Sequence, residues 1–363
     1  MRKLASVQEI AWKKPIEGRD RIELCGVLGW SLITKKDEFA IGDKCVYIEI
    51  DSVLPADNPN FAFLESKKYI IKTMKMAGVY SQGICFPLSI LPEKNWQVGD
   101  DVTETLKIKQ YEPTMDTEVG ATEIDKKKTS WLHKKLMRYS WYRKVFYTTH
   151  MYNNTEFPTQ YVHKTDETRI NTMPWILDDK TKKWVVTEKI DGSSGTFLLV
   201  KHPHKLRKPT FEYILCSRNR RIPKDNGTAY WVVSNKYSIP DKLHQLIGSM
   251  DWIAIQGEVI GPKIQKNKYK VTEPDLYVFN VITPAGRMDS VSARNLCETV
   301  GLKFVPIIDD NFTLLDTVDE MLDYATGDSV LGNTLREGFV FRSSDGVSSF
   351  KAVSPKFLMK YDE

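Results

Sequence analysis

The sequence predicts an α+β protein in two parts, a small β-barrel followed by a larger domain of antiparallel strands with a few helices. Two observations support this prediction. Residues up to about 113 contain short apolar runs and tight Gly-Asp turns, without a convincing long helix. From about residue 156 the apolar runs become longer, and segments with helical spacing lie between them.

Length and composition exclude several classes of protein. The chain has 363 residues, of which 41% are hydrophobic and 27% charged, as in ordinary globular proteins. No apolar run reaches the ~18–20 residues of a membrane-spanning helix, and the start lacks a signal-peptide core. Five scattered cysteines form no CxxC pair, so neither a disulfide framework nor a zinc site is indicated. We therefore expect no membrane association and a cytoplasmic or other reducing compartment.

The first part, residues 1–113, is predicted to be a nucleic-acid-binding barrel of OB or SH3-like type. Residues 22–34 (IELCGVLGWSLIT) and 45–50 (CVYIEI) are apolar or alternating runs. An Ile-Gly-Asp turn at 41–43 precedes the second run, and a Val-Gly-Asp turn at 98–100 leads into DVTETLKI. Short strands joined by such turns favour a small barrel.

Residues 114–155 form a basic linker that is rich in aromatic residues. It contains eight Lys and Arg against four Asp and Glu, and no acidic side chain lies between Asp125 and Glu156. Basic residues interleaved with rings suit a polyanion. The same pattern fits a basic amphipathic helix resting on the core or a helix on a membrane surface. We expect at least one helix here, because structureless connections of this length are uncommon in compact proteins.

The second part, residues 156–363, is predicted to be built on antiparallel strands. Runs rich in β-branched and aromatic residues predict the strands WVVTEK, GTFLLV, FEYILCS, WIAIQGEVI, LYVFNVI, GFVFRS and SFKAVS. Helical spacing predicts helices over 241–249, 290–300 and 317–326.

The segment EKIDG contains a candidate nucleophile. Lys189 closes a predicted strand, and Asp191, two residues later, points the same way along an extended chain. A lysine nucleophile must be neutral, so the site has to lower its pKa by roughly three units from ~10.4, a bias of about 4 kcal/mol. A bound metal ion and other lysines can supply that bias. Taken alone, the segment fits a surface hairpin better than a catalytic site.

Further single charges lie inside otherwise apolar strands. Buried charges need partners, so we expect these residues to face one pocket together with Lys189 and Asp191. They are Arg218, Glu258, Glu337 and Lys351. Such a mixture of carboxylates and cations fits a divalent metal ion and a phosphate chain. The sequence has no Walker A motif, so phosphate binding would depend on lysines and metal.

This series resembles the covalent nucleotidyltransferase superfamily of polynucleotide ligases and RNA capping enzymes. EKIDG resembles motif I, SRN motif Ia, QGEVIG motif III, YVFNVI motif IIIa, REGFVFR motif IV and SFKAVSPKFLMK motif V, in the family order over about 189–360. The resemblance implies a nucleotidyltransferase (adenylyltransferase) domain of antiparallel sheets flanked by helices.

The stretches before the motifs point to one branch of this superfamily. GWSLITKKDEFAIGDKCVYIEIDSVLP, GVYSQGICFPLS and KTDETRIN resemble the ATP-dependent RNA ligases that have an N-terminal OB domain. DNA ligases and capping enzymes carry an OB domain after motif V, and the residues that follow motif V here leave no room for one. The implied architecture is an OB-like β-barrel followed by the catalytic domain.

The resemblance implies catalytic and metal-binding roles for five residues. Lys189 attacks the ATP α-phosphate, and Lys351 binds that phosphate in the transition state. Asp191 is implied to act in catalysis together with these two lysines. Asp191, Glu258 and Glu337 are implied to hold magnesium or manganese, partly through water. One of these carboxylates is instead a candidate to hydrogen-bond the ribose.

Other matching residues are implied to bind the nucleotide. Phe279 stacks on adenine, and Glu188 lies beside the base. Arg218 and Arg169 contact the ribose or phosphates and the RNA end. Two alternatives stay open, since Phe279 also fits a core position and Arg218 also fits a pair with a surface acid.

One departure from the family pattern concerns motif V. Several relatives have a second lysine two positions after the first, where this chain has Val353. Lys356 is a candidate to bind the nucleotide in its place, and Lys360 is another.

The function implied is that of an ATP-dependent RNA ligase that acts in three steps. Lys189 takes up AMP, AMP moves to an RNA 5′-phosphate, and a 3′-hydroxyl then attacks the activated phosphate and expels AMP. The expected partner is RNA with 3′-OH and 5′-phosphate ends in a nicked duplex, and the expected state is a monomer. The alternatives are a DNA ligase, a capping guanylyltransferase that GTP would label, and a non-catalytic RNA-binding protein.

Overall fold

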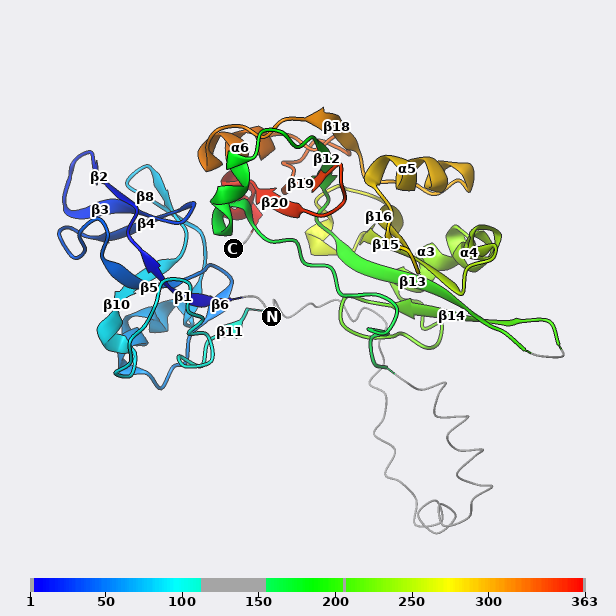
Figure 1. The fold of residues 1–363 in the computed structure, drawn as a ribbon, viewed down its shortest axis with the longest axis horizontal. Coiled ribbons are helices and arrows are strands. Elements are labelled where there is room, and N and C mark those ends of the chain that lie inside the picture. Colours follow the sequence, from blue (N-terminus) through cyan, green and yellow to red (C-terminus); the bar gives the residue numbers. More distant parts are fainter. Residues whose placement is uncertain (1–2, 112–154, 205–206, 362–363) are drawn as a thin grey trace, which may run out of the picture.

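The computed structural model describes residues 3–111, 155–204 and 207–361. Figure 1 shows a barrel of short strands, coloured blue to cyan, beside a larger domain coloured green to red. The prediction of a helical linker over 114–155 lies outside the described residues, apart from Thr155. In the described part of the chain, no helix is long and apolar enough to cross a membrane.

The N-terminal part consists of short antiparallel strands around one apolar core. The strands are β1 (Ala5–Glu9), β2 (Trp12–Ile16), β3 (Arg19–Val27), β4 (Trp30–Lys35), β5 (Lys44–Ile48), β6 (Ser52–Val53), β7 (Ile70–Ile71), β8 (Met74–Met76), β9 (Val79–Ser81), β10 (Ile84–Pro87) and β11 (Lys109–Gln110), with 3-10 helices η1 (Pro59–Lys67) and η2 (Leu88–Ile90). They form the sheets β1-β5-β10, β2-β3-β4 and β11-β6-β7 and the hairpin β8-β9. The predicted runs at 22–34 and 45–50 fall on β3, β4 and β5.

The larger domain contains two antiparallel sheets. Its strands are β12 (Trp184–Lys189), β13 (Ser193–His202), β14 (Thr210–Cys216), β15 (Trp252–Ile260), β16 (Asp275–Thr283), β17 (Gly286–Arg287), β18 (Ile307–Phe312), β19 (Gly338–Ser343) and β20 (Ser349–Val353). One sheet has the order β18-β12-β19-β20, and the other has the order β14-β13-β15-β16-β17. Each strand predicted for this domain is present, and β17 and β18 are additions.

Helices cover the outer faces of these sheets (Figure 1), namely α3 (Ala229–Lys236), α4 (Ile239–Ile247), α5 (Ser290–Thr299) and α6 (Val318–Ala325). The domain also contains α7 (Pro355–Tyr361) and the 3-10 helices η3 (Ile170–Thr172), η4 (Pro174–Asp178) and η5 (Gln265–Asn267). Leu243 of α4 packs in one apolar cluster with Ile255 of the five-stranded sheet. Met321 of α6 packs with Phe341 of the four-stranded sheet. The three predicted helices correspond to α4, α5 and α6.

Contacts near η3 and α7 hold the barrel against the larger domain. The amide of Gly29 donates to the carbonyl of Asn171 over 2.8 Å, and the Asn171 side chain donates back to Gly29 over 2.9 Å. A Cβ at position 29 would lie 3.0 Å from Asn171 Cα, so this close approach favours glycine. Arg169 forms an ion pair with Asp51 of the barrel at 2.9 Å. Phe357 of α7 belongs to the apolar core of the barrel.

We propose that the larger domain begins near residue 156 and the barrel ends near residue 113. In support, Phe157 and Val162 pack against Leu198 and Ala254 of the five-stranded sheet. On the other side, the last barrel strand β11 pairs with β6. The basic linker over 114–155 would then join the barrel to the larger domain.

Candidate active site

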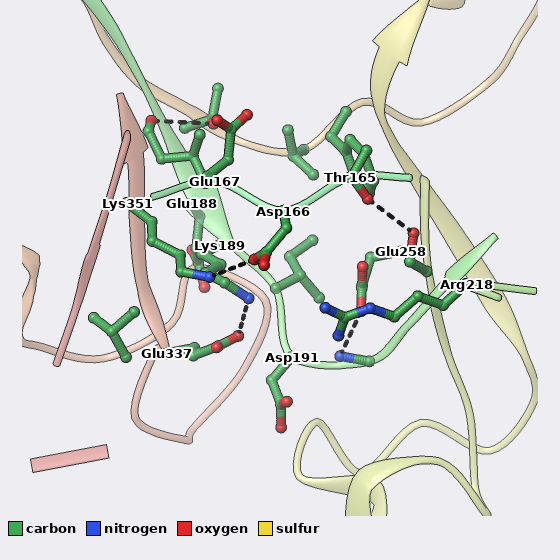
Figure 2. Close-up of a pocket in the computed structure, with 18 of the residues that line it drawn as sticks. Thr165, Asp166, Glu167, Glu188, Lys189, Asp191, Arg218, Glu258, Glu337 and Lys351 are labelled. Atoms are coloured by element: carbon green, nitrogen blue, oxygen red, sulfur yellow. Dashed lines mark hydrogen bonds and ion pairs between the residues drawn. The ribbon is translucent and has the colours of Figure 1, made fainter. Parts of the chain in front are cut away.

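A pocket lies where the two sheets of the larger domain meet (Figure 2). The four-stranded sheet supplies side chains from β12, β19 and β20, and the five-stranded sheet supplies side chains from β15 and β16. The pocket contains these predicted site residues: Arg169, Glu188, Lys189, Asp191, Arg218, Glu258, Phe279, Glu337 and Lys351. The predicted residue Lys356 is exposed on α7 and is not among the residues that line the pocket.

The register of β12 and β19 brings Lys189 to Glu337. Lys189 pairs with Gly338 across these strands, so the residue before Gly338 lies beside the lysine. Lys189 Nζ is 2.7 Å from Glu337 Oε2, and the side chains are 27% and 16% exposed. A Cβ at position 338 would lie 2.0 Å from the carbonyl oxygen of Ala352, and φ there is 156°. The glycine after Glu337 therefore permits the strand pairing that places this carboxylate.

The protein's own groups keep Lys189 charged. Burial alone would lower the pKa of Lys189, but the carboxylates of Glu337, Glu258 and Asp191 together raise it above its usual value. We expected a pKa lowered by cations, and these carboxylates work in the opposite direction. A neutral amine at this position therefore requires positive charge to be brought to the carboxylates.

The other two acids show how strongly the pocket disfavours negative charge. Burial, with the charge of Glu337, raises the pKa of Glu258 to about 8, although the amide of Gly192 donates to its carboxylate over 3.1 Å. Burial and Glu337 also raise the pKa of Asp191 to about 6, despite its ion pair with Lys268. Figure 2 shows the Asp191 carboxylate turned away from Lys189 and Glu337.

Lys351 faces the same pocket from β20. Its Nζ lies 3.0 Å from Asp166, and its amide donates to the carbonyl of Thr168 over 2.8 Å. Burial, with the nearby cations Arg169 and Lys189, lowers the pKa of Lys351 to about 8. Asp166 was not predicted as a site residue, although it lies within the stretch KTDETRIN that supports the family resemblance.

The pocket wall contains an acceptor atom without a hydrogen-bond partner among the described residues. Glu188 is 1% exposed, and its Oε2 accepts from the amide of Val330 over 3.0 Å. Glu188 Oε1 is buried and has no hydrogen-bond partner among the described residues. Because an unsatisfied buried acceptor is costly, this atom is suited to a donor that a ligand brings.

Phe279 and Arg218 lie on the side of the five-stranded sheet. Arg342 donates to the carbonyl of Phe279 over 3.0 Å, and burial lowers the pKa of Arg342 to about 10. Glu167 is the acidic partner of Arg342 at 3.5 Å. Arg218 is exposed, and Figure 2 shows it reaching across the pocket toward the carboxylates. The sequence analysis did not assign Arg342 to the site, because this residue is the last one of the apolar strand motif REGFVFR.

The carboxylates provide oxygen ligands of the kind that magnesium and manganese prefer. Within residues 3–111, 155–204 and 207–361, no three His, Cys, Asp or Glu side chains form a ready-made metal cage. Glu258 and Glu337 line one pocket and act on each other electrostatically. This donor set fits a cation that is shared with phosphate oxygens and water.

Both parts of the chain match family models. Residues 4–88 match a model described as an OB-fold domain, and residues 182–361 match the RNA ligase model. A search of curated protein sequences finds no match.

Solved structures of the Naegleria gruberi RNA ligase are similar over the whole chain. The form with pyrophosphate has 31% sequence identity and a TM-score of 0.81, covering 100% of this chain and 99% of that chain. A mutant with ATP and Mn has the same identity and TM-score, covering 100% of both chains. A mutant with AMP and Mn has 31% identity and a TM-score of 0.82, covering 99% of both chains.

The raised pKa of Glu258 predicts a pH-dependent effect of Glu258→Gln on stability without divalent ions. Below about pH 4.5 the Glu258 carboxyl is protonated in both the folded and the unfolded chain, so its titration does not change the stability of the wild type relative to Glu258→Gln. Between about pH 4.5 and 8 only the unfolded chain releases the proton, so the wild type loses stability relative to the variant. Melting temperatures in EDTA should therefore diverge in favour of the variant up to about pH 8.

Glu298→Gln, on the exposed face of α5, is the matched control and should show no such divergence. A gap between Glu258→Gln and wild type that stays constant or narrows from pH 5 to pH 8 would contradict the raised pKa.

Proposed function

Because the chain belongs to the RNA ligase family, we propose that it seals nicks in duplex RNA with Lys189 as the nucleophile. The enzyme is an ATP-dependent RNA ligase that uses ATP and a divalent metal ion. The OB-fold domain precedes the ligase domain, as the sequence predicts. The single observation that supports the role of Lys189 best is its ion pair with Glu337 inside a pocket lined by both sheets.

In the first step, the Lys189 amine attacks the α-phosphorus of ATP. A nitrogen–phosphorus bond forms, the bond between the α-phosphorus and the bridging oxygen breaks, and pyrophosphate leaves. The Lys189 ammonium, which donates to Glu337 over 2.7 Å, must first lose a proton to water, and a cation bound by Glu337 would favour that loss. The product is AMP joined to Lys189 as a phosphoramidate.

Charge on the phosphates is offset by cations of the pocket. Lys351 is 13% exposed on its side chain and would donate to the α-phosphate in place of Asp166. Glu258 and Glu337 would hold the divalent ion, with Asp191 as a third candidate. The ion supplies positive charge at the phosphates and carboxylates, which also disfavours the ammonium form of Lys189.

The unpartnered oxygen of Glu188 is suited to read the base. The adenine amino group is a donor, whereas the corresponding atom of guanine is an acceptor. Glu188 Oε1 would accept from adenine and would repel guanine. Phe279 would stack on the ring, while Arg342 fixes its backbone. Arg169 and Arg218 at the pocket would contact the ribose, the phosphates or the RNA end.

In the next two steps, AMP is transferred to an RNA 5′-phosphate and then displaced by a 3′-hydroxyl. We propose that the OB-fold domain holds the duplex beside the nick. Its lysines lie over rings, with Lys72 Nζ 5.8 Å from the Tyr111 ring and Lys75 Nζ 5.5 Å from the Tyr80 ring. Such pairs suit phosphates and sugars.

We also propose that the protein acts as a monomer in a reducing compartment. All five cysteines are free and buried, as expected where thiols stay reduced. A single species near 41.8 kDa in light scattering would support the monomer, and a mass twice as large would contradict it.

Incubation with α-phosphate-labelled ATP and magnesium or manganese tests the proposed nucleophile. We expect label on the wild type that survives denaturation, and no label on Lys189→Ala. Lys356→Ala is the matched control, because that lysine is exposed outside the pocket, and it should label like the wild type. A folded wild type that stays unlabelled across metals and pH would refute the proposal.

Glu188→Gln should shift nucleotide preference toward GTP. The amide oxygen can keep accepting from Val330, and the amide nitrogen then faces the base as a donor. Adenine would lose its acceptor, so the ATP-over-GTP ratio of labelling should fall by about ten- to a hundredfold. Labelling with both nucleotides measures the ratio, and an unchanged ratio would show that Glu188 does not read the base.

Sealing of defined RNA substrates tests the preference for nicks. We expect a nicked duplex to be sealed at least about tenfold faster than a single strand, a difference of ~1.4 kcal/mol. Substrates that already carry the 5′-adenylate separate this preference from labelling of Lys189. Equal or faster sealing of single strands would contradict the proposed role of the OB-fold domain.

A further inference from the structure

Lys268 lies beside Asp191, and the chemistry above does not use it. Its side chain is 8% exposed, and its ammonium forms an ion pair with Asp191. The next residue, Tyr269, accepts a hydrogen bond from the Asp191 amide over 2.8 Å. Two neighbouring residues therefore hold both the backbone and the carboxylate of Asp191.

Lys268 is itself held by two rings of α7. Its Nζ lies 4.7 Å from the centre of the Phe357 ring and 4.9 Å from the centre of the Tyr361 ring. The hydroxyl of Tyr361 is 2.8 Å from that of Thr334. A cation between two rings is stabilised by their negative faces, so the ammonium has little freedom to move away from Asp191.

The loop that carries Lys268 has an unusual backbone. Gln265, Lys266 and Asn267 have φ values of 46°, 57° and 49°, which non-glycine residues rarely adopt. The Asn267 side chain bonds both the amide and the carbonyl of Val271, at 3.0 and 2.9 Å. Backbone strain of this kind persists where the surroundings fix it, and it is frequent at functional sites.

The contact between Lys268 and the rings of α7 connects the candidate active site with the OB-fold domain. Phe357 and Leu358 of α7 belong to the apolar core of that domain together with Ile50 and Leu54. The Phe357 ring that contacts Lys268 is therefore held by the docking of the barrel.

We propose that Lys268 is a positioning residue for the adenylylation step. Its ion pair holds the Asp191 carboxylate, which Figure 2 shows turned away from Lys189, and α7 holds Lys268 in place. Without Lys268, Asp191 would be a buried carboxylate lacking its partner, and Lys189 is the cation it would turn to. A second carboxylate bound to Lys189 would hold its amine away from the position of an incoming α-phosphate. This inference rests on the proposed role of Lys189.

A double-mutant cycle of Lys268→Met and Asp191→Asn tests this inference. Lys268→Met should slow single-turnover formation of lysyl-AMP by about ten- to a hundredfold, the usual effect of losing such a supporting contact. In the Asp191→Asn background the same change should have less than about a threefold effect, because residues that act through each other are not additive. Lys268→Arg, which keeps the charge over the rings, should retain most of the rate.

The melting temperature gives a second readout that needs no activity. Lys268→Met should lower the melting temperature more when Asp191 is present than in the Asp191→Asn background, because only the carboxylate loses its ion pair with Lys268. The melting temperatures test the inference even if Asp191→Asn forms lysyl-AMP too slowly to measure.

Lys303→Met is the matched control. Lys303 pairs with Asp275 at 2.6 Å and lies 5.4 Å from the Tyr277 ring, yet neither Lys303 nor Asp275 lines the pocket. Its loss should leave the rate of labelling unchanged.

Two results would overturn the inference while leaving the proposed function intact. One is a wild-type rate in Lys268→Met, and the other is an equal loss of rate and stability from Lys268→Met in both backgrounds. An unlabelled wild type would instead refute the nucleophile itself.

Discussion

The ion pair between Lys189 and Glu337 is the interaction on which the rest of the site depends. A lysine can attack a phosphate only as a neutral amine, yet three carboxylates around Lys189 raise its pKa. In the proposed mechanism the same carboxylates would hold a divalent cation, and its charge would offset the charge that keeps the proton on Lys189. The proposed nucleophile would then become reactive only when metal and nucleotide are bound.

Strand register is what places these opposing charges together. Lys189 ends β12 opposite Gly338 of β19, while Lys351 lies opposite Val340 on the other side of β19. Glu258 approaches from the second sheet, opposite Ser194 of β13. A shift of one residue would turn each charge toward the opposite face of its sheet. The apolar cores that fix the register therefore also fix the positions of these charges. Helix α7 packs into the core of the OB-fold domain, so that domain also helps to hold the pocket.

Most of the fold could be predicted from the sequence, because long β-branched and aromatic runs specify strands such as β15 and β19. The segment of β18 was missed since its centre, Asp309 to Asn311, has the composition of a turn. The pocket members were found because lone charges in apolar strands need partners. Arg342 gives the same signal, but it was passed over because it ends its strand motif. Asp166 and Lys268 were not assigned, because nothing in their local sequence shows the tertiary contacts with Lys351 and Asp191.

The charge state of Lys189 is the most direct test of this account. Competitive labelling with acetic anhydride across pH, read by mass spectrometry of the peptide that contains Lys189, measures it without metal or nucleotide. We expect the wild-type lysine to react as an amine of raised pKa, and Glu337→Gln to shift its titration to lower pH. A wild-type titration below that of free lysine, or one that Glu337→Gln leaves unchanged, would contradict the account.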